Sequence, residues 1–178
     1  VIIINYYYGD DYVGLWANTI RIFNSVIVFL LAACLPFVLK MLRDQELISK
    51  KIKIFYYLWA AFLPLIFLSF IVVSNWGTYI FSIFQSFDID VTNADMSIIF
   101  LISVVISFIG SSQGLYQATN KSIILLLMVI TTAFFGMVII YNTSFSFASL
   151  IELFLFLVLF LMFMILVHLT YNLINKIK

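Results

Sequence analysis

Charged residues are what this sequence lacks most. They make up 10% of its 178 residues, whereas soluble domains carry about 25%, and 65% of the chain is hydrophobic. So few charges cannot cover a water-soluble surface, which excludes an ordinary soluble domain. The net charge of +1, without a large basic cluster, gives no basis for nucleic-acid binding. The length allows a single domain over residues 1–178.

Histidine and cysteine are also scarce, because each occurs once, at His168 and Cys34. One histidine excludes a bis-histidine haem or a histidine-ligated copper centre within the chain. One cysteine excludes an internal disulfide and leaves no cluster for zinc or iron–sulfur. The isolated glycines form no phosphate-binding loop. We therefore expect no cofactor and no metal bound by this chain, and no catalysis by the chain alone.

Signals for targeting are absent from the first residues. The segment from Val1 to Asp11 has neither the basic start of a signal peptide nor the Arg/Ser-rich character of a transit peptide. The apolar set is rich in Phe, with 20 residues, and the chain has 10 Tyr. These residues are typical of AT-rich codons and favour an organellar gene, which would need no such peptide.

Long apolar runs are what the sequence has instead. A membrane-spanning helix needs roughly 20 apolar residues, and about five segments meet that length. We place the spans at about residues 22–39, 54–73, 97–116, 122–141 and 145–171. The predicted fold class is therefore all-α, a polytopic membrane protein. Pro36 and Pro64 lie within the first two spans, and we expect each to kink its helix.

The connection from Asn75 to Met96 is the longest between spans. Its first half is apolar and aromatic and fits a short amphipathic helix in the plane of the membrane interface. Its second half carries three acids. The turn at residues 142–144, between the last two spans, is short and uncharged.

The charges of the loops predict the orientation. With five spans, one side of the membrane holds the basic loop at residues 40–53, Lys121, and the C-terminal residues Lys176 and Lys178. The opposite side holds the acids of the longest connection and, as its one basic residue, Arg21. Because positive residues mark the inner side, we expect the N-terminus outside and the C-terminus inside.

Glu152 is the candidate functional residue, because it is the only acid within a predicted span. It lies seven residues after Phe145, which places it roughly 10 Å into the helix. A carboxylate at that depth costs a few kcal/mol unless it faces protein or water. A proton-carrying or charge-coupling role is the functional interpretation. The structural alternative is a capping or interhelical hydrogen-bonding role near the helix N-terminus.

His168 lies sixteen residues beyond Glu152, about 160° around the same helix. The two side chains are therefore not expected to form a pair on one face. We interpret His168 as an interface or inner-end residue rather than as a member of a relay.

Small residues recur along one side of the third span. Such a stripe allows helix backbones to approach closely in lipid, so we expect it to be buried against other helices. Its members are Ser103, Ser107, Gly110, Ser111 and Gly114. Thr131 and Thr132 of the fourth span are expected to bond to their own helix.

The last third of the chain resembles a known family. The pattern comprises Gly136-Met137, an apolar run, Asn142, and then residues 149–153 with Glu152 between Ile151 and Leu153. It is similar to the antiporter-like membrane subunits of respiratory complex I, and most of all to subunit two of the mitochondrial NADH:ubiquinone oxidoreductase. In that family a glutamate in this setting belongs to the proton-translocation machinery.

The resemblance implies a location, partners and a role. The chain would lie in the mitochondrial inner membrane as a multi-pass subunit of complex I, in contact with lipid and with other membrane subunits. The family has many more spans and an intramembrane lysine on a later helix, and no predicted span here contains a lysine. The chain would then be the N-terminal part of a split subunit, with the lysine on another chain.

Three alternatives remain open on the sequence. Subunit four-L of the same complex also has a helix with a Glu-Leu pair, but in that subunit the helix is the second of three spans. Subunit six of the complex is a weaker option. A structural or lipid-facing subunit of another organellar complex, such as cytochrome oxidase or ATP synthase, is the second class. A small transporter is the third, although such a protein normally has more polar residues within the bilayer.

Overall fold

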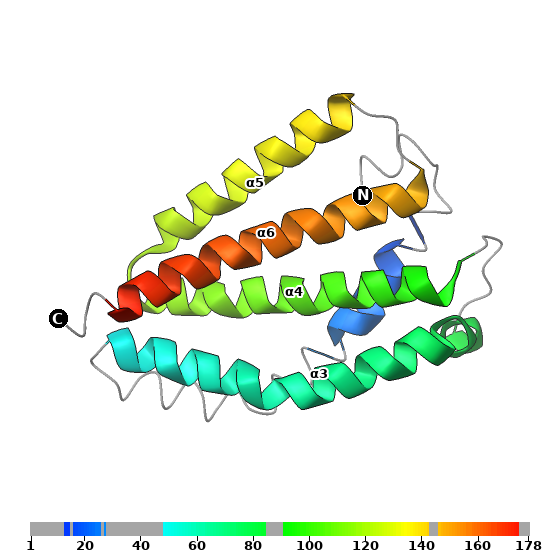
Figure 1. Cartoon of the computed structure of the whole chain (residues 1–178), viewed down its shortest axis with the longest axis horizontal. Helices are drawn as coiled ribbons and strands as arrows, with labels where there is room; N and C mark the ends of the chain where they lie inside the picture. Colours follow the sequence, from blue (N-terminus) through cyan, green and yellow to red (C-terminus); the bar gives the residue numbers. More distant parts are fainter. Residues whose placement is uncertain are drawn as a thin grey trace.

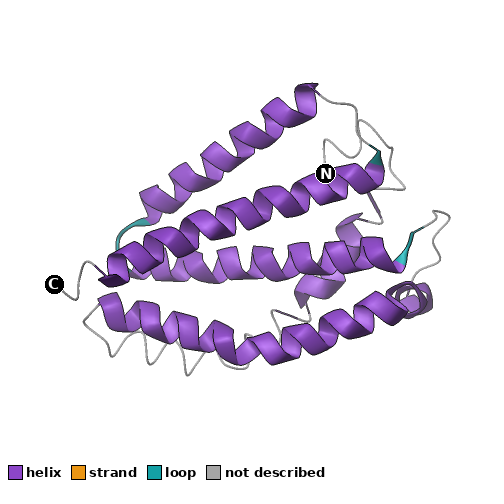
Figure 2. Cartoon of the chain, in the orientation of Figure 1, coloured by secondary structure: helices purple, strands orange, loops and turns teal. Residues whose placement is uncertain are grey.

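The computed structural model describes residues 13–14, 16–25, 27, 48–84, 91–142 and 146–174. Within them the regular structure is helical, with no strand (Figure 2). Four long helices dominate: α3 (Ile48–Phe84), α4 (Asn93–Ala118), α5 (Ser122–Asn142) and α6 (Phe147–Ile174). Each is long and apolar enough to cross a membrane. The predicted class, an all-α polytopic membrane protein, is confirmed.

The four helices lie side by side in the order α5, α6, α4, α3 (Figure 1). α4 is the most enclosed, with 44% of its most apolar stretch buried against 11% for α3. We call the end with the start of α3, the α4–α5 turn and the end of α6 the inner end, following the predicted orientation. The opposite end is the outer end. Which side of the membrane each end faces stays a prediction.

The last four predicted spans each lie within or largely overlap one of the helices α3 to α6. The first predicted span, residues 22–39, falls mostly outside the described residues, as do Pro36 and Cys34. Residues 16–25 are helical, and Trp16, Phe23 and Ile27 belong to the apolar cluster at the outer end. Within it the Phe23 ring contacts Phe100 of α4, and the Trp16 ring contacts Phe154 of α6.

α3 extends well beyond the predicted second span. Its 37 residues would measure about 55 Å as a straight helix, more than the roughly 30 Å of bilayer hydrocarbon. Pro64 lies within it, as expected, and the ribbon bends near its middle (Figure 1). The last turns are seen nearly end-on in the same view, so the helix also turns before it ends.

A contact with α4 accounts for that second turn. The backbone N–H and the hydroxyl of Thr78 both donate to Asn93 Oδ1, each at 2.9 Å, and Asn93 Nδ2 donates to the Asn75 carbonyl. A side chain of α4 thus enters the hydrogen-bond ladder of α3, a recognised cause of helix bending. The aromatic segment after Asn75 is therefore helical, as predicted, but it continues α3 to Phe84 instead of forming a separate helix.

Side chains define where α4 and α6 begin. In α4, Thr92 Oγ1 accepts from the Asp95 N–H at 3.2 Å while Asp95 Oδ2 accepts from the Thr92 N–H at 3.0 Å, which is a capping box. In α6, Ser146 Oγ accepts from the Ser149 N–H at 3.2 Å. The cap of α6 is therefore Ser146, and the capping role considered for Glu152 is wrong.

The small-residue stripe of α4 is only partly buried. Ser103 and Ser107 are buried, and Ser111 accepts from the Trp59 indole N–H of α3 at 3.0 Å. Gly110 and Gly114, in contrast, are exposed, and a Cβ on either would meet nothing within 4 Å. The described helices therefore bury the serines of the stripe but leave these two glycines uncovered.

Candidate functional site

Glu152 is the sixth residue of α6, one turn and a half past the Ser146 cap. Its side chain is exposed, on a helix that is otherwise almost entirely apolar. Leu150 and Ile151, its neighbours, are buried in the bundle at 2% and 1% exposure. α6 therefore buries its opposite side and turns the carboxylate away from the other described helices.

The carboxylate of Glu152 makes no hydrogen bond or ion pair with any described residue. The interhelical hydrogen bond considered for it is therefore absent from the described part of the chain. The side chain belongs to an exposed stripe that continues along α6 with Phe156, Phe163, Val167 and Tyr171. One charge thus lies at the outer end of an otherwise apolar surface.

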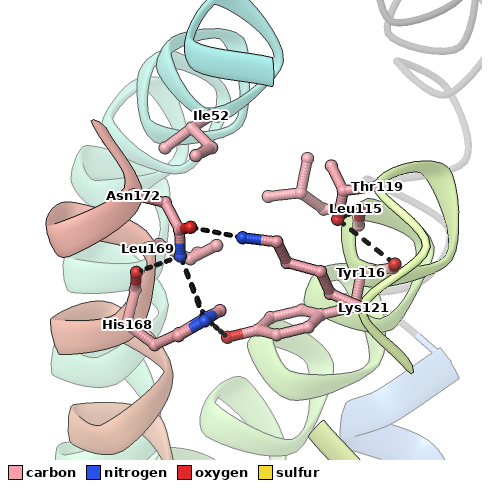
Figure 3. A pocket seen from close by; sticks show the side chains of 8 residues that line it. All are labelled: Ile52, Leu115, Tyr116, Thr119, Lys121, His168, Leu169 and Asn172. Atoms are coloured by element: carbon pink, nitrogen blue, oxygen red, sulfur yellow. Dashed lines mark hydrogen bonds between the residues drawn. The ribbon is translucent and has the colours of Figure 1, made fainter. Parts of the chain in front are cut away.

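His168 lies at the other end of the same helix and faces inward. Its Nδ1 lies 2.7 Å from the Tyr116 hydroxyl of α4, and the two rings stack with centroids 5.4 Å apart (Figure 3). Glu152 and His168 therefore lie on different sides of α6. The interpretation of His168 as an inner-end, interhelical residue agrees with this geometry.

Asn172 extends this contact by one helical turn. Its amide group donates to the His168 carbonyl at 2.7 Å and to His168 Nε2 at 3.0 Å. Its Oδ1 accepts a short hydrogen bond from Lys121 Nζ, at the α4–α5 turn. We call Tyr116, Lys121, His168 and Asn172 the inner-end cluster.

The tautomer of His168 sets the direction of its bond to Tyr116. Asn172 Nδ2 can only donate, and it contacts both ring nitrogens of His168, at 3.0 Å from Nε2 and 3.4 Å from Nδ1. When the imidazole carries its proton on Nδ1, it donates to the Tyr116 oxygen and the Tyr116 hydroxyl proton is unused within the cluster; in the other tautomer Tyr116 donates to Nδ1. Two of the three N–H groups of Lys121 are unused in either tautomer.

Sequence reasoning singled out His168 but did not find its partners. Tyr116 and His168 are 52 residues apart, so no local pattern joins them. One usable indication existed: the third and fifth predicted spans run in the same direction, so their last turns lie at the same depth. The i, i+4 spacing of His168 and Asn172 also places both on one side of α6.

Comparison with protein-family models, with curated proteins and with solved structures finds no match to this chain. Among the described residues, no three His, Cys, Asp or Glu side chains come together as metal ligands would. The chemistry that the described residues offer is therefore that of an exposed intramembrane carboxyl and of a neutral hydrogen-bond cluster next to a lysine.

Proposed function

We propose that this chain is a membrane-arm subunit of mitochondrial respiratory complex I that takes part in proton translocation coupled to NADH:ubiquinone electron transfer. In this proposal it is the N-terminal part of subunit two, in the inner membrane, and Glu152 is its proton-carrying group. The other membrane subunits are its partners. The chain binds no cofactor of its own.

The exposed carboxylate of Glu152 is the observation that carries this proposal. An acid on a spanning helix costs a few kcal/mol when lipid surrounds it, so such residues normally face protein or a water-filled cavity. In this chain the side chain faces away from the described helices. It therefore requires a neighbour from outside them, as a subunit of a larger assembly would have.

No described cation, Arg21 included, forms an ion pair with Glu152. The described lysines lie at the inner end, on the first turns of α3 and at the α4–α5 turn. Lys121 bonds to Asn172, twenty residues along α6 from Glu152, which is about 30 Å of helix. A lysine of another chain, within a few helix widths of Glu152, is the partner that the family resemblance implies. Such a charge would switch the carboxyl between its protonated and ionised forms.

Substitution of Glu152 in the assembled complex tests the proposal. Glu152→Gln keeps size and hydrogen bonding but removes titration. We expect the complex to assemble and its proton pumping to fall at least about tenfold, since a positioned acid–base group contributes that much or more. Phe156→Leu, one turn further along the same exposed stripe, is the matched control and should pump normally.

The opposite pattern would show that Glu152 is structural. If Glu152→Gln pumps as well as the wild type, while Glu152→Leu only impairs assembly, the carboxyl is a packing and hydrogen-bonding group. The chain would then fit the structural-subunit alternative, and proton translocation at this residue would be ruled out.

A further inference from the structure

The inner-end cluster surrounds a small pocket. α4 and the turn after it contribute Leu115, Tyr116, Thr119 and Lys121, α6 contributes His168, Leu169 and Asn172, and α3 contributes Ile52 (Figure 3). The enclosed space admits roughly one water-sized group. A single oxygen atom of a larger ligand fits there, with the rest of the ligand over the opening.

The cluster keeps unused N–H and O–H groups beside the pocket. Asn172 uses its amide hydrogens on His168, and Thr119 Oγ1 donates to the Leu115 carbonyl at 3.0 Å. The remaining hydrogens are two on Lys121 Nζ and, in the Nδ1–H tautomer of His168, the Tyr116 hydroxyl proton. A group that accepts hydrogen bonds complements these hydrogens.

Among the described residues, the charge around the pocket has one sign. Lys121 is half-buried, and its only partner among the described residues is the neutral Asn172 amide. Lys51 and Lys53 flank Ile52, which lines the pocket, and Lys50 precedes them on α3. The two described carboxylates, Asp95 and Glu152, lie near the outer end. A half-buried ammonium that has no counterion among the described residues favours an anion beside it.

The surroundings point to a lipid as the source of that anion. The pocket lies at the inner ends of α3, α4 and α6. Helices that span a membrane end near its surface, which is where lipid headgroups lie. α5 begins directly after Lys121, and its first turns expose Ile123 at 74%, Leu126 at 57% and Leu127 at 58%. An acyl chain can lie along this face while its phosphate reaches Lys121.

We propose that the inner-end cluster is a binding site for the phosphate of an anionic phospholipid. In this site one phosphate oxygen accepts from Lys121 Nζ and, with the His168 proton on Nδ1, from the Tyr116 hydroxyl. The lysines at the start of α3 add attraction at longer range. Basic pockets between spanning helices recognise anionic headgroups in this way. The inference does not depend on the assignment to complex I, because it concerns the other end of α6.

Native mass spectrometry of the full chain, titrated with phosphatidylglycerol or phosphatidylcholine, tests the proposal. The wild type should prefer phosphatidylglycerol. Lys121→Gln should lower its affinity for that lipid about fivefold, the effect of one lysine near an anionic surface. Lys121→Arg should retain binding.

Arg21→Gln, which removes one positive charge from the predicted opposite side, is the matched control and should stay within about twofold of the wild type. Equal affinities in Lys121→Gln and Arg21→Gln would overturn the proposal.

Two further arms keep the test decisive. Inorganic phosphate should not displace phosphatidylglycerol more than chloride does at equal ionic strength. If it does, the site binds free phosphate and the lipid assignment is wrong. If Lys121→Gln does not fold, Tyr116→Phe decides. This variant keeps the charge but removes the spare hydroxyl, and it should bind phosphatidylglycerol about threefold more weakly or worse. Unchanged binding would overturn the proposal.

Discussion

At its inner end α6 turns His168 and Asn172 onto α4, whereas near its outer end it turns Glu152 away from the bundle. His168 and Asn172 form most of their hydrogen bonds within the chain, whereas the Glu152 carboxylate forms none with the described residues. Polar side chains that stabilise a fold should find partners inside it. The difference therefore indicates a structural role for His168 and Asn172 at the inner end, and a role in contact with other chains for Glu152 at the outer end.

The largest stability effect that this comparison predicts is at His168. His168→Leu leaves the Tyr116 hydroxyl and the Asn172 amide without a shared partner, so we expect a loss of about 1–3 kcal/mol in the free energy of unfolding. Unfolding of the isolated chain in mixed detergent measures it. Glu152→Gln is the control and should change that free energy by less than about 0.5 kcal/mol. Equal losses would show that both ends are structural.

A smaller effect distinguishes two glycines at the two ends of the bundle. A Cβ on Gly77 would lie 3.0 Å from Met96 Cβ and 3.3 Å from Val73 Cγ1, so Gly77→Ala must push α3 away from α4. We expect a loss of about 1–2 kcal/mol in the same unfolding assay.

Gly114→Ala is the matched substitution, because a Cβ there meets nothing within 4 Å. We expect it to be neutral or to stabilise the isolated chain by up to about 1 kcal/mol, since alanine favours helix over glycine. A large loss at Gly114 would mean that the inner half of α4 is covered, as the stripe pattern predicted.

The sequence predicted the helices better than their ends and their contacts. α5 begins and ends within one residue of its predicted span, because Lys121 and the 142–144 turn bound the apolar run. α3 exceeded its span at both ends: apolarity marks the membrane-crossing part of a helix, whereas the bend at Thr78 depends on Asn93 of another helix.

The candidate site shows the same limit. Glu152 stood out because a lone charge in an apolar run is visible without any structure. The partners of His168 did not, because the Tyr116 contact depends on the relative depth and rotation of α4 and α6. The exposure of Gly110 and Gly114 has a related reason: spacing places residues on one side of a helix but does not say how far a neighbouring helix extends along it.

Thr131 and Thr132 are the opposite case, in which local chemistry is enough to predict the hydrogen bonds. Their hydroxyls donate to the Leu127 and Met128 carbonyls four residues earlier, at 2.8 and 2.9 Å, as predicted. A short side chain in an apolar helix reaches its own backbone first, so no tertiary information is needed.

What lies beside residue 152 in the native membrane tests the central claim most directly. A photoreactive side chain placed at this position, followed by mass spectrometry of the crosslinked products, identifies that neighbour. We predict crosslinks to another polypeptide, with a lysine in its adjoining helix. Crosslinks to lipid acyl chains alone would contradict the account, because Glu152 would then have no protein group with which to exchange charge.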